Sequence, residues 1–222
     1  MSHQQEESQS GLMFLLMSLL AFSGLGLEML LAFFIEPLIY KYTLNQFSTT
    51  QVILHWVITC VMWLMIALVL ITVSKKKLQF DMFVPKNQLR TSDWVICFLL
   101  LVVSITFSVY NWNGLKVLKE FAYNGWLKFI FQYIYYAVET ILVVLIIVFG
   151  QKAGELWFKN AKIPWGGIIV AFTWGLVHMV TKGSLENGIW GLVSGLMYGI
   201  VYLVCKKNLR LAVPIIFLMF VL

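Results

Sequence analysis

Long apolar runs alternate with short charged segments along the whole chain. Six of the runs reach or nearly reach the roughly 20 residues that an α-helix needs to cross about 30 Å of hydrocarbon. They lie at about 12–35, 50–74, 93–110, 127–149, 165–182 and 188–205. A seventh run, 211–222, has 12 residues and would cover only about 18 Å as a helix, so it is either a half-span or a truncated span. The pattern predicts an all-α fold, a polytopic transmembrane helical bundle of six to seven spans.

The composition supports a membrane location. Of the 222 residues, 61% are apolar and 12% are charged, and the mean hydropathy is +0.87, whereas about 25% of the residues of a soluble domain are charged. We expect a polar N-terminal tail at 1–10 and a single transmembrane domain at 11–222. Because the tail lacks the cationic start and the cleavage site of a signal peptide, the first span should stay in the mature protein.

The positions of the cations predict an orientation. With the N-terminus inside, the inner loops hold 11 lysines and arginines and the outer side holds 5, and this excess favours a cytoplasmic N-terminus. The inner set is Lys75, Lys76, Lys77, Lys86, Arg90, Lys152, Lys159, Lys162, Lys206, Lys207 and Arg210, and the outer set is Lys41, Lys116, Lys119, Lys128 and Lys182. Since these cations flank apolar runs, the net charge of +6 fits anionic lipid head groups and not nucleic acid. The predicted partners are the bilayer and either another membrane protein or a peptide substrate.

An ionisable residue inside a predicted span costs about 2.5–3.5 kcal/mol on insertion scales and so needs a functional or structural explanation, and four such residues matter most here. They are Glu28, His55, Glu139 and His178. Glu28 and His55 fall near the outer surface, where we expect them to be solvated or hydrogen-bonded to each other. Glu139 and His178 lie roughly 15–20 Å from the inner ends of neighbouring spans and form the candidate catalytic pair.

Two polar stripes accompany this candidate pair. Gln132, Tyr135, Tyr136 and Glu139 follow an i, i+3, i+4, i+7 spacing that places them on one helix face. Trp174, His178 and Lys182 recur every four residues on the next span, and Tyr198 lies on the span after that. A carboxylate and an imidazole at one depth could share a proton, hold a water or bind a metal. Alternatively, a neutral Glu139 bonded to His178 or Tyr135 could close a buried network without chemistry.

Small residues mark the sixth predicted span. Gly191, Gly195 and Gly199 are spaced four residues apart, and such a face lets another helix approach closely. We interpret this face as a helix-packing surface.

Four segments in the second half of the chain follow a recognisable order. Ala137 to Thr140 carries a glutamate, Trp174 to His178 reads Trp-x-x-x-His, Ser194 to Gly199 is rich in glycine, and Ala212 to Ile216 follows. In this order the core at about 127–222 resembles the CPBP family, the membrane-embedded type II CAAX prenyl proteases and their bacteriocin-processing or Abi relatives. That family carries Glu-Glu-x-x-x-Arg, then Phe-x-x-x-His, then a glycine-rich span and a last helix with His-x-x-x-Asn. The resemblance implies a bacterial, multi-pass plasma-membrane protein, in which the glutamate activates water and the histidines support the site.

Most of the family's polar positions are changed in this chain. Thr140 replaces the second glutamate, Val144 stands at the arginine position, and Trp174 replaces the phenylalanine. Leu218 and Leu222 occupy the places of the terminal histidine and asparagine. Only the glutamate and the first histidine remain, so the resemblance implies a degenerate site.

Zinc would be under-liganded in such a site. A catalytic zinc ion needs about three protein ligands, and the histidines besides His178 are His3 in the tail and His55 near the predicted outer face. The sequence therefore predicts no metal and no cofactor.

Three functions stay open, and the first is favoured. It is a CPBP-like protein without proteolytic activity that acts as a membrane scaffold, immunity factor or regulator. The second is an active intramembrane endopeptidase in which Glu139 is the general base and His178 stabilises charge. The third is a proton-linked small-molecule carrier, which is ranked last because the sequence has no internal repeat or pair of broken helices.

Overall fold

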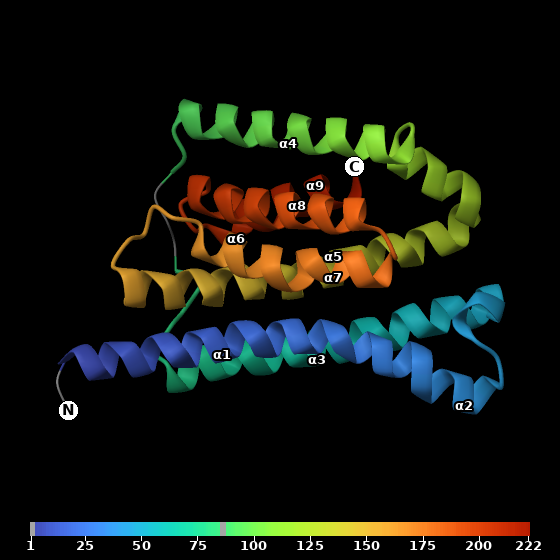
Figure 1. Cartoon of the computed structure of the whole chain (residues 1–222), viewed down its shortest axis with the longest axis horizontal. Coiled ribbons are helices and arrows are strands. Elements are labelled where there is room, and N and C mark those ends of the chain that lie inside the picture. Colours follow the sequence, from blue (N-terminus) through green and yellow to red (C-terminus); the bar gives the residue numbers. More distant parts are fainter. Residues whose placement is uncertain (1–2, 85–87) are drawn as a thin grey trace.

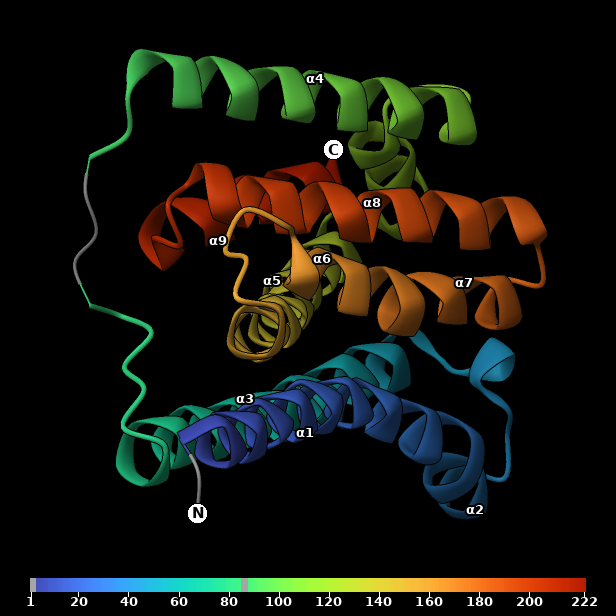
Figure 2. The ribbon, with the colours of Figure 1, turned by 60° about the vertical axis from the view of Figure 1, so that its left-hand side comes forward.

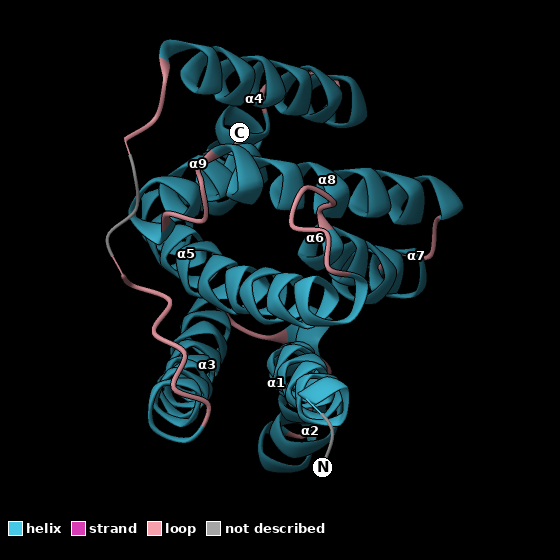
Figure 3. Cartoon of the chain, turned by 90° about the vertical axis from the view of Figure 1, so that its left-hand side faces the viewer, coloured by secondary structure: helices cyan, strands magenta, loops and turns pink. Residues whose placement is uncertain are grey.

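The computed structural model describes residues 3–84 and 88–222, so Lys86 of the orientation count lies outside the described residues. The described part is all-α, which confirms the predicted fold class. Five of its helices are long and apolar enough to cross a membrane, and two apolar helices are shorter. The longest helices all extend along the long axis of the view in Figure 1, although the turned view of Figure 3 shows that some of them cross the others at an angle.

The first half of the chain contains α1 (His3–Leu30), the π-helical turn η1 (Leu31–Ile35), α2 (Glu36–Tyr40), the 3-10 turn η2 (Leu44–Gln46), α3 (Thr49–Lys77) and α4 (Thr91–Trp112). The second half contains α5 (Lys116–Phe158), α6 (Trp165–Val170), the π-helical turn η3 (Ala171–Gly175), α7 (Leu176–Thr181), α8 (Leu185–Val204) and α9 (Leu209–Val221). Residues 3–10, expected as a tail, are helical and continuous with the first span.

Two predicted segments differ from the structure, and a third, the last apolar run, is as short as expected. The predicted span at 165–182 is a helix of 17 residues divided by η3. The last apolar run forms α9, whose 13 residues cover about 20 Å. The fourth span is far longer than 127–149, because α5 has 43 residues and continues on both sides. Gly125 interrupts α5 with φ 68° and ψ 172°, a conformation that glycine adopts without steric cost.

The helices form three groups around α5. The helices α1 and α3 pack on one side of α5, and α6 and α9 pack on another, with α8 against the broken helix α6–η3–α7. The helix α4 is outermost and contacts mainly α8 and α9, as Figures 2 and 3 show from two directions. Residues 142–151 of α5 are all buried, as expected for a helix that is apolar all round and lies in the centre of a bundle.

Glycines set the contact between α8 and the broken helix. A Cβ atom on Gly191 would lie 2.5 Å from the carbonyl oxygen of Gly175, and one on Gly195 would lie 2.7 Å from the amide nitrogen of Ala171. Gly199 lies against the backbone of Gly167 in the same way. The two backbones touch directly, which only residues without a side chain allow.

Candidate functional site

The structure brings Glu139 and His178 to one place through Trp174. The indole Nε1–H of Trp174 donates a 2.9 Å hydrogen bond to Oε1 of Glu139. The Trp174 ring lies edge-on against the imidazole of His178, with ring centroids 4.4 Å apart. Both Glu139 and His178 are partly exposed. The indole therefore links the two predicted catalytic residues, joining α5 to the broken helix.

The hydrogen bond of His178 fixes its tautomer. Nδ1 lies 2.7 Å from the backbone carbonyl oxygen of Trp174, and because a carbonyl only accepts, Nδ1 must carry the proton. In the neutral ring Nε2 is then the acceptor. Lys116 and Lys182 interact electrostatically with both Glu139 and His178, so two cations lie near the pair.

The side chains of the polar stripe on α5 contact three different neighbouring residues. Gln132 donates to the Tyr136 hydroxyl over 2.7 Å, and the Tyr136 hydroxyl donates to Glu120 over 2.8 Å. Tyr135 packs against the Trp63 ring of α3, with centroids 5.0 Å apart. Glu139 alone reaches Trp174. Four side chains that share a helix face thus do not share one site.

Tyr198 joins the site through its ring. Its centroid lies 6.0 Å from that of Trp174, and Tyr198 is buried. It also borders a small apolar hollow with Thr140, Val143, Ile216 and Phe220. Its position favours a packing role beside the indole.

Glu120 and Lys116 are functional candidates that the sequence reasoning missed. Both lie in the short part of α5 before Gly125, which the sequence placed in a loop. Glu120 is buried and accepts hydrogen bonds from the hydroxyls of Tyr133 and Tyr136. The Lys116 ammonium donates to the carbonyl oxygen of Phe220 over 2.8 Å. The apolar spacing of Leu115, Leu118 and Phe121 is the signal that could have revealed this helical segment.

A second ionisable cluster joins α1, α2 and α3. His55 Nδ1 lies 2.8 Å from Oε2 of Glu36, and His55 Nε2 lies 3.4 Å from Oε1 of Glu28. The contact between Glu28 and His55 is one of the two arrangements that we expected. Glu36 was missed because it directly follows the predicted end of the first span, although the apolar residues after it indicate that the helix continues.

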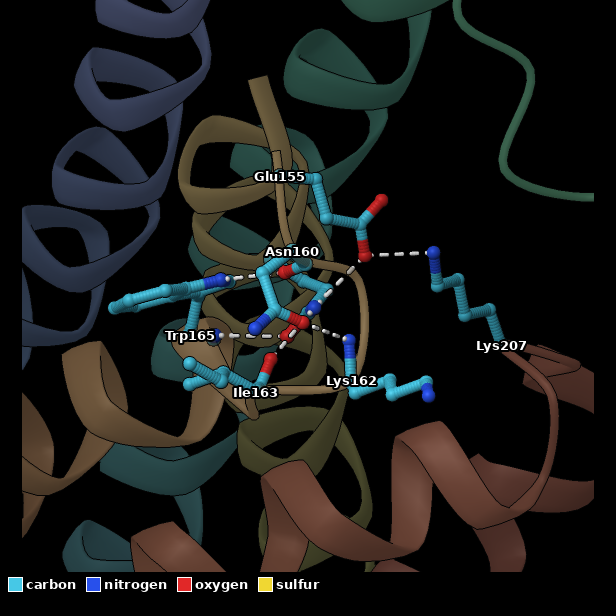
Figure 4. Close-up of polar contacts among 8 residues, drawn as sticks. Glu155, Asn160, Lys162, Ile163, Trp165 and Lys207 are labelled. Atoms are coloured by element: carbon cyan, nitrogen blue, oxygen red, sulfur yellow. Dashed lines mark hydrogen bonds and ion pairs between the residues drawn. The ribbon is translucent and has the colours of Figure 1, made fainter. Parts of the chain in front are cut away.

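A third polar cluster surrounds Gln151, beyond the predicted end of the fourth span. Its amide Nε2 donates to Oε1 of Glu155 over 2.7 Å and to the carbonyl oxygen of Ile163 over 3.0 Å, and its Oε1 accepts from the backbone amide of Gly166 over 3.2 Å. Glu155 also pairs with Lys207 over 2.6 Å, a contact drawn in Figure 4. These bonds tie the end of α5 to the start of α6 and to the turn before α9.

The Gln151 cluster borders a cavity of about 170 Å³. Its lining includes Asp81, Lys152, Glu155, Tyr202 and Lys207. Asp81 also pairs with Lys75 over 2.8 Å, and this hydrogen bond lowers the pKa of the Asp81 carboxyl below its ordinary value. The cavity has two cations and two carboxylates on its wall, without an excess of either charge.

The donors near Glu139 do not fit a zinc ion, the metal that the CPBP resemblance suggests. Glu139 and Nε2 of His178 could supply two ligands at most, since Nδ1 of His178 bonds the backbone of its own helix. Within residues 3–84 and 88–222, no group of three or more His, Cys, Asp or Glu side chains is arranged to hold a metal ion. A catalytic zinc ion would need about three such ligands.

We expect the Trp174→Phe substitution to destabilise the protein by about 1–3 kcal/mol, because it removes the donor to a carboxylate in a poorly solvated place. The ring contacts with His178 and Tyr198 can persist in the variant. The free energy of unfolding in mixed micelles, followed by circular dichroism, measures the effect.

Trp190→Phe is the matched control for Trp174→Phe. Trp190, a half-buried residue of α8, donates over 3.3 Å to the exposed Glu186, so the loss of this bond should cost less than about 0.5 kcal/mol. An equal loss of unfolding free energy in the two variants would show that the hydrogen bond to Glu139 contributes no more to stability than the bond to Glu186.

Searches against protein families, curated proteins and solved structures found no match to this chain.

Proposed function

We propose that this multi-pass helical membrane protein is a divergent, non-proteolytic relative of the CPBP family that binds another membrane protein and acts as its scaffold or regulator. The proposal rests on the hydrogen bonds of Glu139 and His178, the two side chains that match the polar positions of the family. Glu139 accepts from the Trp174 indole, and His178 bonds the backbone of its own helix. Each of these hydrogen bonds joins helical segments or stabilises one of them, which is a structural use of the two side chains.

The changed family positions support the same proposal. Thr140 donates to the carbonyl oxygen of Tyr136 on its own helix over 2.8 Å, and Val144 is buried in the core. Neither side chain can stabilise an oxyanion at Glu139, and such stabilisation usually lowers the barrier of peptide hydrolysis by several kcal/mol. A chain that keeps the order of the family's sequence segments but lacks these groups is suited to bind a membrane-embedded segment without cleaving it.

An active endopeptidase is the second candidate, and one observation favours it. Nε2 of the neutral His178 ring is left as an acceptor, and the shared indole keeps the ring near Glu139. A water between them could in principle be activated by the carboxylate.

One assay separates the two candidates. Purified protein in liposomes is incubated with prenylated CAAX peptides and with leader peptides, and the products of the wild type, Glu139→Gln and His178→Ala are compared by mass spectrometry. We expect the three proteins to yield the same background of products. Cleavage by the wild type that falls at least 100-fold in Glu139→Gln would overturn the non-proteolytic proposal and establish the endopeptidase.

Partner binding is tested separately in the native membrane. A photo-crosslinking residue replaces Phe98 or Val102, which lie exposed on the outermost helix α4, and the control replaces Leu20, which is exposed on α1. We expect one defined membrane protein to be captured from α4 and not from α1. Capture of lipid alone at both positions would contradict a scaffold function.

A further inference from the structure

The α2 segment buries its charge and exposes its apolar side chains. Of residues 33–40, only Glu36 is buried, with 1% of its surface exposed. Its neighbours Phe33, Phe34, Ile35, Leu38 and Ile39 are exposed. Burial of an ionisable group at a membrane helix costs free energy unless it is paired, so the contacts of Glu36 need an explanation.

The π-helical turn η1 places the Glu36 side chain on the same helix face as Glu28, toward His55. An α-helix turns about 100° per residue, so eight residues from Glu28 to Glu36 would leave the two side chains about 80° apart around the axis. In η1 the amide of Glu36 donates to the carbonyl oxygen of Leu31, five residues back. This extra residue in the turn reduces the offset to about 20°. Glu28 and Glu36 thus lie on one face, which is directed at α3.

His55 of α3 lies between the two carboxylates. Its side chain is 2% exposed, Nδ1 is 2.8 Å from Glu36 and Nε2 is 3.4 Å from Glu28. Carboxylate oxygens and bare ring nitrogens are both acceptors, so each of these contacts requires a proton. A neutral imidazole supplies only one proton. The three side chains therefore bind one proton more than they would if the histidine were neutral and both glutamates were ionised.

Within the part of the chain that the structure describes, one carboxylate oxygen of the cluster has no hydrogen-bond partner, so only the additional proton nearby balances its negative charge. Among the described residues, Oε1 of Glu36 is buried and has no hydrogen-bond partner. Without the additional proton, the site would contain two carboxylates, a neutral ring and this orphaned oxygen, and a charge buried without a partner is strongly destabilising. Glu28 is the accessible member, since 29% of its side chain is exposed, and it offers a route for the proton.

Other titratable groups also face this cluster. Glu28 interacts electrostatically with the thiol of Cys60 on α3 and with Tyr135 and Glu139 on α5. These neighbours are neutral or acidic, and none of them adds a positive charge. They favour a cationic His55 at the centre.

We propose that Glu28, Glu36 and His55 form a proton-binding site in which His55 is an imidazolium held between two carboxylates. The bound proton fastens residues 31–40 to α3, and its release to water at high pH leaves a neutral ring with one unsupported contact and loosens that segment. The site lies at the end of the bundle that carries α2, opposite the N-terminus (Figures 1 and 2). It does not rest on the proposed function, since it uses neither Glu139 nor His178 as a ligand of the proton.

The charge of His55 can be measured directly in the full chain. The protein carrying His3→Gln and His178→Gln retains His55 as its single histidine, and its ¹⁵N-labelled ring is observed by solid-state NMR in liposomes at pH 7.5. We expect more than nine-tenths imidazolium, whereas a histidine free in water is only about one-tenth charged at that pH. A mostly neutral ring, or a metal-bound signal that a chelator removes, would overturn the proposal.

Variants in the same background test the carboxylates. Glu36→Gln and Glu28→Gln should each lower the imidazolium fraction at pH 7.5 to below one half. Glu186→Gln, which changes an exposed glutamate of α8, should leave it unchanged. If the signal of Glu36→Gln equals that of the wild type, the carboxylate does not hold the proton.

The attachment of residues 31–40 to α3 is measured by the distance between two spin labels. Labels at Leu38→Cys and Leu54→Cys, both exposed positions, are introduced after Cys60, Cys97 and Cys205 are replaced by serine. We expect one narrow distance at pH 7 that becomes broad as the pH rises to 10, and no change with pH in Glu36→Gln. A distribution that stays narrow across this range in the otherwise wild-type protein would contradict release of the segment.

Discussion

Gly175→Ala is expected to destabilise the protein by about 3 kcal/mol, at the upper end of the cost of overpacking a well-packed contact. The added Cβ would lie 2.6 Å from the carbonyl oxygen of Gly191 and 2.8 Å from its carbonyl carbon. Backbone atoms of a neighbouring helix cannot rotate away as a flexible side chain can, so the helices must separate. Reversible unfolding by sodium dodecyl sulfate in mixed micelles, followed by circular dichroism, gives the change in free energy.

The control for Gly175→Ala is the same substitution at Gly26. Gly26 is an exposed residue of α1, and a Cβ atom there would meet nothing within 4 Å. Because alanine is the better helix former, Gly26→Ala should be neutral or stabilising by up to about 1 kcal/mol. A similar loss of stability in both variants would mean that the close contact between α8 and the broken helix does not limit stability.

Gln151→Leu should cost about 1–3 kcal/mol, because it leaves the buried backbone amide of Gly166 without its acceptor, whereas the carbonyl oxygen of Ile163 still accepts from the amide of Trp165. The carbonyl oxygen of Ile163 and the amide of Gly166 both bond the Gln151 side chain, which is 1% exposed. An orphaned buried polar group typically costs about 1–3 kcal/mol. The same micelle unfolding experiment measures this loss, and increased hydrogen exchange of the Gly166 amide would locate it at the start of α6.

Gln51→Leu makes the same chemical change in an exposed setting. Gln51 accepts from the backbone amide of Ser48 at the start of α3, and we expect its loss to cost less than about 1 kcal/mol. If Gln151→Leu were no more harmful than Gln51→Leu, the Gln151 cluster would not be a structural centre.

The sequence alone identified the five long apolar helices and four of the ionisable residues within the apolar runs. Hydrophobicity along a run is a local property, so the composition of 50–74 or 93–110 is enough to predict a span. Helix periodicity correctly aligned Gln132, Tyr136 and Glu139 on one face. Glycine spacing similarly pointed to a close-packed face around Gly195, because small residues are needed wherever two backbones touch.

The ends and interruptions of the helices were harder to predict. The sequence gives Gly125 no marker that distinguishes a break from an ordinary helical glycine, so the segment before it was placed in a loop. The π-helical turns have no compositional signature either, since they differ from an α-helix by a single extra residue in one turn. Gln151 was missed because its polarity suggested the end of a span, whereas neighbouring backbone groups allow it to lie inside the protein.

By itself, the sequence determined that this chain is a helical membrane protein with costly ionisable groups at defined heights, because apolar length and helical spacing are local quantities. The tertiary structure decided which groups meet. It linked Glu139 to His178 through an indole, paired Glu36 with His55 through a π-helical turn, and directed Gln132 to Glu120. These partners come from different helices, and their contacts depend on the rotation and packing of whole helices, which no single segment of sequence specifies.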